Sequence, residues 1–378
     1  MGLTEIRIAG YRSVHSIQFP VRQLSVLVGA NGVGKTNLYR GLELVRAAAT
    51  GELSHSIARE GGLGSVMWAG ERKAHEAPRM TLQVSLDGIL FGERDAFAPT
   101  YEVEIGFGDA RYEAVFELEP QIKSEKLSFT QGRRNVALLE RKGAAAWYRD
   151  DAGNRRQLEE PLLAGETALA ALRGTLPELD AVRHTLSAWR FYHGFRTDAD
   201  APLRKPALAI TAPMLDADGG NLAAVFATLA HIKQDTEDLH AAIEHAFPGA
   251  QLFIPPPGTN ASFTMSFPDM PKRQFGANEL SDGTLQFLAL MGALLAYRLP
   301  PLIALNEPEA SLHPQLLPAL ARIIALAAQR SQVWVVTHSQ VLADALAGET
   351  GVVPRTVIRQ DGGTWLEGLS RFGEFDDD

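Results

Sequence analysis

Eight consecutive residues near the N-terminus constrain the fold of this chain more than any other segment. They are Gly29, Ala30, Asn31, Gly32, Val33, Gly34, Lys35 and Thr36, and they match the pattern G-x-x-x-x-G-K-[ST]. An apolar run over residues 24–28 precedes them and is typical of a strand buried on both faces of a parallel sheet. Residues 37–49 have the pattern of a helix. A strand, a glycine-rich turn and a helix in this order predict a loop that cradles nucleotide phosphates.

Each residue type in this loop has a physical role. The glycines let successive backbone N–H groups turn toward the phosphates, and the start of the helix adds the positive end of its dipole. Lys35 is expected to reach the β- and γ-phosphates, in binding and in catalysis, and the Thr36 hydroxyl to ligate Mg²⁺. We therefore predict ATP and Mg²⁺ as cofactors, held by residues 29–36 and the adjacent Asn37. The alternative, a chance glycine-rich turn, does not explain the flanking strand and helix.

The patterns along the chain predict an α/β fold with a discontinuous core. Residues 1–50 and 275–365 read as a parallel-sheet core, residues 51–160 as an antiparallel β-rich subdomain and residues 161–274 as a mainly helical insertion. An acidic tail over 366–378 follows, and we expect its last four residues to be disordered. Within the middle region we expect strands over 80–86, 101–107 and 112–117, and helices over 166–192, 221–232 and 236–247.

Composition excludes several classes of protein. The chain has 378 residues, and its 46% hydrophobic and 21% charged residues are typical of a globular protein with a large core. Its net charge of -9 gives no general attraction to nucleic acid or to an anionic membrane. Without cysteine there are no disulfides, thiolate zinc sites or thiol catalysis. The longest apolar run, over 287–297, is too short to cross a bilayer. We expect a cytoplasmic protein with no membrane insertion.

A second candidate phosphate site lies at Leu280-Ser281-Asp282-Gly283-Thr284. A long apolar helix follows this segment, so Ser281 and the Gly283 backbone stand at a helix N-terminus, where N–H groups and the dipole favour an anion. Ser281 could instead serve only as the N-cap of a core helix. The position of the segment between other motifs favours the first interpretation.

Two more polar groups follow short apolar strands. Asn306 and Glu307 follow the apolar run over 302–305, and His338 follows the apolar run over 333–337. In an open parallel sheet, the carboxyl ends of the strands form one crevice where ligands bind. We therefore expect the loop at Gly29, the Asn306–Glu307 pair and His338 to meet at one edge of the sheet. A solvated carboxylate and a structural histidine are the alternatives for Glu307 and His338.

The order of these motifs resembles that of ABC-type ATPases, and within them the compact SMC/RecF/OLD-like class. Specific motifs carry the resemblance over about 1–50 and 275–345: Tyr11-Arg12-Ser13 ahead of GANGVGKTN, then LSDGT, NEPEASLHP and THS. The resemblance implies that Glu307 polarises the attacking water and that His338 contacts the γ-phosphate. It also implies that Thr36 ligates Mg²⁺ and that Asn306 contacts the Mg²⁺ coordination shell. It further implies an ATP-dependent homodimer, in which Ser281, Asp282 and Gly283 of one copy complete the nucleotide site of the other.

This chain departs from the family pattern in three places. Asn306 stands where the family usually has Asp, so a nucleotide-gated binding switch with weak turnover is an alternative to an efficient ATPase. The glutamine expected between the first two motifs is not assigned, with Gln121 and Gln83 as candidates. We expect no nuclease-like domain after His338, and the sequence has no sustained heptads for a coiled coil. A P-loop kinase or GTPase would lack both the LSDGT helix and the histidine.

The biological role is less defined than the chemistry. The resemblance suggests DNA repair, chromosome maintenance or phage defence. The insertion, with Arg196, Arg204 and Lys205, could bind DNA or a partner protein, or could form a structural cap. Other basic pairs, at 133–134, 155–156 and 272–273, read as solvated surface.

Overall fold

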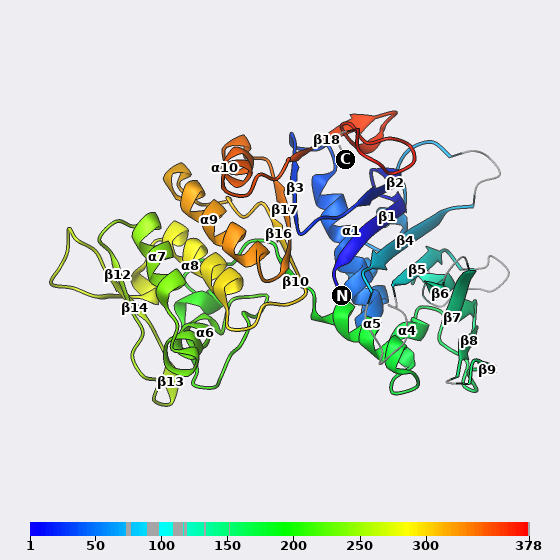
Figure 1. Cartoon of the computed structure of the whole chain (residues 1–378), viewed down its shortest axis with the longest axis horizontal. Coiled ribbons are helices and arrows are strands. Elements are labelled where there is room, and N and C mark those ends of the chain that lie inside the picture. The colour runs from blue at the N-terminus through cyan, green and yellow to red at the C-terminus, as the bar shows by residue number, and fades with distance from the viewer. Residues whose placement is uncertain are drawn as a thin grey trace. The chain divides into compact units, whose positions relative to one another are not determined.

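The computed structural model describes residues 1–72, 77–88, 98–108, 116, 119–131, 134–150 and 152–376 (Figure 1). The chain divides into two compact units. Unit 1 comprises Met1–Arg22, Gly29–Trp189 and Thr356–Asp378, and unit 2 comprises Gln23–Val28 and Arg190–Arg355. The predicted strand over 112–117 lies outside the described residues except for residue 116.

An antiparallel sheet of eight strands forms the centre of unit 1, in the order β2-β1-β4-β5-β6-β7-β8-β9. Alternating burial explains these strands, since every second residue of β4 faces the core. The predicted strands over 80–86 and 101–107 correspond to β4 and β5. The strands are β1 (Leu3–Tyr11), β2 (Val14–Pro20), β4 (Arg79–Leu86), β5 (Pro99–Gly106), β6 (Gln121–Gln131), β7 (Arg134–Lys142), β8 (Ala145–Arg149) and β9 (Arg155–Gln157).

Helix α1 (Lys35–Thr50) packs against this sheet and against three further helices of unit 1, α2 (Leu53–Arg59), α4 (Ala168–Ala171) and α5 (Pro177–Ala188). Gly41 on α1 allows the close approach, because a Cβ there would lie 2.4 Å from Cδ1 of Ile8 on β1. A hairpin of β18 (Arg355–Gln360) and β19 (Gly363–Leu366) lies beside β2. Unit 1 also contains α3 (Leu63–Val66).

Unit 2 contains the parallel sheet that the sequence predicts. Its strands run in the order β10 (Arg190–Tyr192), β16 (Leu302–Asn306), β17 (Gln332–Thr337) and β3 (Leu24–Val28). Every residue of β16 and β17 is buried, as expected for strands covered on both faces. The register brings their carboxyl ends into line, with Tyr192 opposite Leu305 and Thr337 opposite Val28. The α/β fold class is confirmed.

Helices α7, α8 and α9 contact one another in the core of unit 2 (Figure 1). Helix α8 is buried at every residue from Thr284 onward, which explains its nearly continuous apolar sequence. The helices are α6 (Leu222–Thr228), the π-helical turn η2 (Leu229–Lys233), α7 (Glu237–Ala246), α8 (Asp282–Leu295), α9 (Leu317–Ala328) and α10 (Gln340–Thr350), with 3₁₀ turns η1 (Pro202–Arg204), η3 (Ala277–Glu279) and η4 (Pro314–Leu316). Within the described ranges, no helix combines the length and apolarity needed to cross a membrane.

Several predicted boundaries differ from the structure. The single helix predicted over 166–192 is wrong: α4 and α5 are separate helices, and residues 190–192 form β10. The region 161–274 is also less helical than predicted, since it contributes β10 and the short strands β11 (Ala207–Leu208), β12 (Gln251–Phe253), β13 (Asn260–Ala261) and β14 (Thr264–Ser266); β14 pairs in turn with β15 (Phe275–Gly276).

The division into units does not follow the predicted domains. Residues 1–50 are split, because β1 and β2 join the antiparallel sheet whereas β3 joins the parallel one. The expected disorder of the last four residues is wrong at Phe375, which is buried and forms a bridge with Leu369.

Candidate nucleotide site

The loop Gly29–Thr36 begins at the residue after β3 and ends in the first turn of α1. Gly34 has φ 101°, in the left-handed region that favours glycine. A Cβ on Gly34 would lie 1.9 Å from Thr364 Oγ1 and 2.5 Å from Ser13 Oγ, and a Cβ on Gly29 would lie 2.6 Å from the Val357 carbonyl oxygen. Both positions therefore require glycine for steric reasons, and Gly34 requires it for its conformation as well.

The side chain of Lys35 folds back into this loop. Its Nζ donates to the carbonyl oxygens of Gly29 at 2.7 Å and Ala30 at 2.8 Å, and the residue is only 4% exposed. The loop thus holds an ammonium group within its own backbone, next to a helix N-terminus. Both features favour an anion.

Polar contacts from other parts of unit 1 fix the loop. The Thr364 hydroxyl on β19 donates to the Val33 carbonyl oxygen at 2.8 Å and lies 2.7 Å from Ser13 Oγ. The amide of Asn37, predicted to contact the nucleotide, donates to the same Ser13 hydroxyl at 2.7 Å. A cavity of about 400 Å³ opens here, and its lining includes Ser13, Asn37 and Trp68.

In unit 2, Asn306 is the last residue of β16 and is 3% exposed. Its Nδ2 forms a short hydrogen bond with Nδ1 of His193, which directly follows β10. Its Oδ1 is buried and has no hydrogen-bond partner within the described part of the chain. Buried acceptors are nearly always paired in proteins, so this oxygen fits a ligand such as a metal-bound water.

Glu307 follows with φ 50°, an uncommon conformation for a residue with a side chain. Its N–H donates to the Val336 carbonyl oxygen at 2.7 Å, which ties the residue to β17. Its Oε1 lies 3.7 Å from Nδ1 of His338, and both side chains are partly exposed. Glu307 and His338 therefore lie close together at the ends of adjacent strands.

A third acidic residue, Glu309, connects the turns after β16 and β17. It is 7% exposed, and its Oε1 accepts from the Thr337 hydroxyl at 2.5 Å and from the backbone N–H groups of His338 at 3.0 Å and Ser339 at 3.2 Å. The same oxygen lies 3.1 Å from His338 Nδ1. Glu309 thus holds both the backbone and the ring of His338.

The LSDGT segment begins α8. Ser281 is its N-cap, with Oγ accepting from the Thr284 N–H at 3.2 Å. A Cβ on Gly283 would lie 3.0 Å from the Ser311 carbonyl oxygen, so glycine permits close packing against the turn after β16. Together, Ser281, Gly283 and residues 311–316 line most of a hollow of about 620 Å³. Asp282 is not among the residues that line this hollow, and its carboxylate pairs with Arg204 at 2.6 Å.

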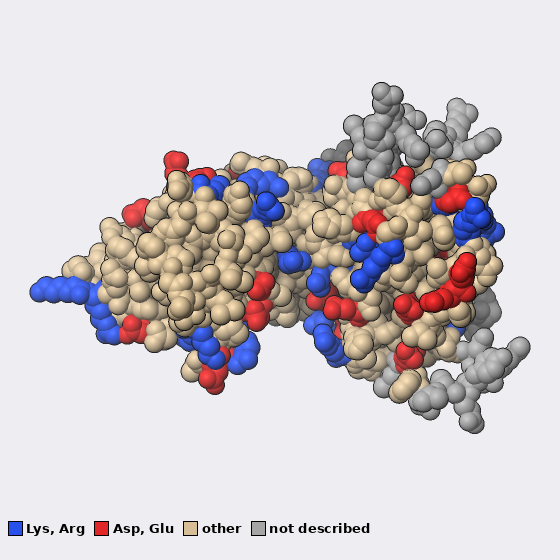
Figure 2. All heavy atoms as spheres, turned by 90° about the horizontal axis from the view of Figure 1, so that it is seen from below, with Lys and Arg blue, Asp and Glu red and all other residues tan. Residues whose placement is uncertain are grey.

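The basic residues proposed for partner binding are mostly engaged within the chain. Arg196 pairs with Asp198 at 2.9 Å, and the Arg204 side chain is only 13% exposed. Figure 2 shows lysine and arginine interspersed with aspartate and glutamate over the described residues of one face. No continuous basic surface is visible among those residues on that face.

The structure groups the predicted site residues by unit. Gly29–Asn37 form one group in unit 1, whereas Asn306, Glu307 and His338 form another in unit 2, with Ser281–Gly283 at the start of α8. The glutamine candidates Gln83 and Gln121 lie on β4 and β6 of the antiparallel sheet. His193 occupies the position directly after β10, the strand that pairs with β16.

Sequence reasoning did not find His193, Glu309 or the role of Arg204. A signal was available for two of them: Phe191-Tyr192-His193 repeats the pattern of an apolar strand followed by a polar residue, and Glu309 is a second carboxylate two residues after Glu307. Nothing in the sequence links Arg204 to a segment more than seventy residues away.

Comparison with known structures shows a similar fold in one SMC head domain and weaker similarity to two others. An SMC head bound to the C-terminal winged-helix domain of ScpA is 13% identical, with 98% of both chains covered and a TM-score of 0.54. A Pyrococcus furiosus Smc head with an extended coiled coil, bound to the C-terminal domain of ScpA, is 13% identical over 98% of this chain and 96% of that one, with a TM-score of 0.49. The Thermotoga maritima SMC head domain is 14% identical over 98% and 100%, with a TM-score of 0.43.

No curated protein matches the sequence significantly. A protein family does: the AAA domain described as "putative AbiEii toxin, Type IV TA system" matches residues 24–344. This range extends from β3 through α8, β16 and β17 into α10, and it contains the loop Gly29–Thr36, the LSDGT segment, Asn306–Glu307 and His338, whereas Tyr11-Arg12-Ser13 lies before it. The chain therefore belongs to this AAA-domain family.

Proposed function

We propose that this chain binds ATP with Mg²⁺ and hydrolyses the γ-phosphate bond with Glu307 and His338. The main support is the polar cluster at the carboxyl ends of β16 and β17, where a carboxylate, an imidazole and the unpaired Asn306 oxygen come together. Strand β3, which leads directly into the loop Gly29–Thr36, lies next to β17 in the same sheet. Nucleotide chemistry is expected at this edge of an α/β sheet.

Each residue has a distinct role in this proposal. Lys35 and the backbone of residues 29–36 bind the phosphates, and the cavity beside Ser13 and Trp68 accepts the nucleoside. Thr36 and Asn306 are the residues that would hold Mg²⁺, which neutralises phosphate charge when bound. Glu307 orients the attacking water, and His338 donates a hydrogen bond to the γ-phosphate.

Steady-state phosphate release tests the hydrolysis. We expect the wild type to release phosphate from ATP in the presence of Mg²⁺, and Glu307→Gln to reduce the rate by about a hundredfold or more, as for loss of a general base. ATP binding by Glu307→Gln should be unchanged, whereas Lys35→Ala should lose it. Undiminished turnover in Glu307→Gln would exclude Glu307 as the residue that orients water.

We further propose that two copies pair around two ATP molecules. Ser281 and Gly283 line an open hollow, as required of a surface that meets a phosphate held by another chain. Sedimentation velocity of Glu307→Gln should detect a dimer with ATP and Mg²⁺ and a monomer without nucleotide. A protein saturated with ATP that stays monomeric would contradict this pairing.

A second candidate function is a nucleotide-gated switch with little turnover. The specific observation in its favour is Asn306, whose amide brings no negative charge to the Mg²⁺ position and is already bonded to His193. Rapid single-turnover measurement distinguishes the two functions. A switch would hold ATP for many minutes, and Asn306→Asp would accelerate its hydrolysis.

For the biological setting we favour defence against phage over DNA repair or chromosome maintenance. The toxin–antitoxin description of the matched family agrees with this choice, and the interspersed charges in Figure 2 give little support to DNA binding. A cytoplasmic location fits such a role. Expression of wild type and Glu307→Gln in bacteria challenged with phage tests it, and equal phage yields with and without the protein would argue against defence.

A further inference from the structure

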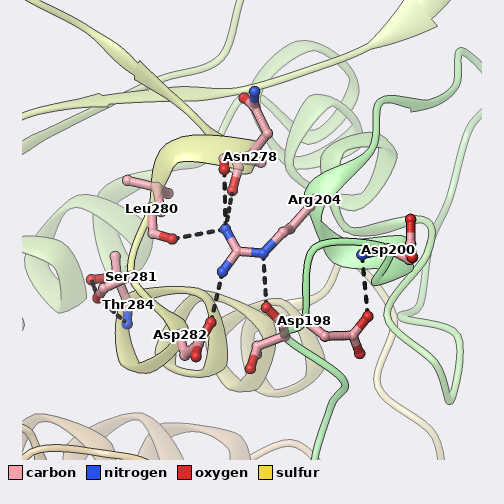
Figure 3. A network of polar contacts seen from close by, with 10 residues as sticks. Asp198, Asp200, Arg204, Asn278, Leu280, Ser281, Asp282 and Thr284 are labelled. Carbon is pink, nitrogen blue, oxygen red and sulfur yellow. Dashed lines mark hydrogen bonds and ion pairs between the residues drawn. The ribbon is translucent and has the colours of Figure 1, made fainter.

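Arg204 lies at the end of η1 and extends its guanidinium group beneath the segment that leads into α8 (Figure 3). Its Nη1 donates to the carbonyl oxygens of Ala277 at 3.4 Å, Asn278 at 3.2 Å and Leu280 at 2.9 Å. Its Nε donates to the Thr197 carbonyl oxygen at 2.8 Å, and its Nη2 donates to Asp282 Oδ1 at 2.6 Å. One side chain therefore binds four backbone carbonyls, three of them in the segment before α8, and the acidic residue of the LSDGT turn.

These contacts fix the direction of the peptide groups. In a planar trans peptide the N–H points opposite to the carbonyl of the preceding residue. Because the Leu280 carbonyl points to Arg204, the Ser281 N–H points away from it. Arg204 thus turns the carbonyl side of the segment inward and leaves the N–H side for the hollow beside Ser281 and Gly283. A phosphate needs donors and is repelled by carbonyl oxygens, so this orientation suits an anion.

The second contact is electrostatic. Asp282 stands between Ser281 and Gly283, and its side chain is 64% exposed. A carboxylate at this position would repel a phosphate that approaches the start of α8. Arg204 is largely buried and forms a charge-assisted hydrogen bond with this carboxylate, so its positive charge offsets the repulsion between Asp282 and a phosphate.

We propose that Arg204 is the residue that prepares the LSDGT turn for the γ-phosphate of the nucleotide on a second copy. It does so by orienting the backbone and by neutralising Asp282. This inference rests on the proposed ATP-dependent pairing and deepens it, because it assigns a residue outside every sequence motif to the phosphate contact. Arg204 acts through the turn and is a positioning residue.

The test measures the ATP-dependent dimerisation constant by sedimentation velocity in the Glu307→Gln background. Arg204→Ala should weaken dimerisation by about thirtyfold or more, as for loss of a hydrogen-bonded buried charge at an interface. Binding of a fluorescent ATP analogue to the monomer should change by less than about threefold, since the loop Gly29–Thr36 does not use Arg204. Arg204→Lys should restore little, because lysine lacks the planar fork.

Arg196→Ala provides the matched control. Arg196 lies in the same segment and pairs with Asp198, but its side chain is 68% exposed. A surface pair of this kind contributes little, so dimerisation should be unchanged. If Arg204→Ala dimerises as Arg196→Ala does, the proposal is overturned.

Asp282→Asn separates the two effects and does not depend on the folding of Arg204→Ala. This variant keeps an oxygen that can accept from Arg204 but removes the negative charge. Its dimers should therefore be as tight as those of the Glu307→Gln parent, or tighter. In the Arg204→Ala background, Asp282→Asn should recover about tenfold of the loss, the share that comes from charge. Weaker dimerisation in Asp282→Asn alone would overturn the proposal. A Glu307→Gln parent that stays monomeric with ATP would overturn the pairing itself, and the role of Arg204 with it.

Discussion

Replacing Glu309 by glutamine should weaken unit 2 measurably, although this residue contacts no substrate in the proposed mechanism. Its Oε1 accepts hydrogen bonds from Thr337, His338 and Ser339 at 2.5, 3.0 and 3.2 Å, in a position only 7% exposed. A hydrogen bond to a charged group contributes about 1 kcal/mol more than one to a neutral group. Three such bonds, one of them long, give a loss of about 2–3 kcal/mol for the neutral amide.

The corresponding change in melting temperature can be estimated. For a domain of roughly 150–250 residues, 1 kcal/mol corresponds to about 2–4 °C, so Glu309→Gln should lower the melting temperature of unit 2 by about 4–12 °C. Circular dichroism during heating measures this shift. Glu349→Gln is the control: Glu349 pairs with Arg322 at 3.0 Å on the surface, where both side chains are over a third exposed. Such a pair contributes about 0–1 kcal/mol, so the control should change little.

A second measurement connects Glu309 to function. Because Glu309 holds the ring and backbone of His338, Glu309→Gln should lower turnover while ATP binding is retained. If Glu309→Gln and Glu349→Gln melt within about 2 °C of each other, the three hydrogen bonds do not stabilise the turn as we infer. Unchanged turnover would show that His338 does not need this support.

Three further predictions concern the loop, the metal position and unit 1. Gly34→Ala should abolish ATP binding, measured by calorimetry, because its Cβ would collide with Thr364 and Ser13; measurable affinity would refute the steric argument. Asn306→Asp should lower the Mg²⁺ concentration needed for half-maximal ATPase activity by about tenfold, since a carboxylate is a stronger ligand for hard cations; an unchanged Mg²⁺ titration would contradict it. Burial raises the pKa of Glu125, so the stability that depends on this group is present below about pH 4 and is lost as pH rises through the folded-state pKa. We therefore expect urea unfolding from pH 4 to 8 to show that the free energy of unfolding of the wild type falls relative to that of Glu125→Gln as pH rises. A wild type that becomes more stable than the variant as pH rises would refute this assignment.

The sequence predicts those parts of the fold that depend on local patterns. The strands over 24–28, 302–305 and 333–337 are short, apolar and followed by polar residues, and all three lie in the parallel sheet. The loop Gly29–Thr36 carries its own glycine requirements. In these places, the residues that determine the structure are neighbours in sequence.

Other parts depend on contacts between distant segments. Residues 190–192 are as apolar as the helix before them, and only pairing with β16 makes them a strand. This is why the sequence patterns did not reveal His193. Glu309 and Arg204 form hydrogen bonds with backbone groups of other segments. Because nearly every residue type carries the same backbone N–H and C=O groups, the sequence does not show which residues are the partners.

The stretch between His193 and Arg204 has a consequence for how a pair of copies would behave. At one end it is bonded to Asn306, at the other to the turn before α8, and in between the Phe195 N–H donates to Gln286 of α8 at 3.3 Å. In the proposed pair, Asn306 serves the nucleotide of its own copy and Ser281 serves that of the other. A rearrangement around one nucleotide would thus reach the second through a dozen residues of one chain. Thermodynamic linkage then requires reciprocity: each nucleotide must alter the affinity for the other by the same factor.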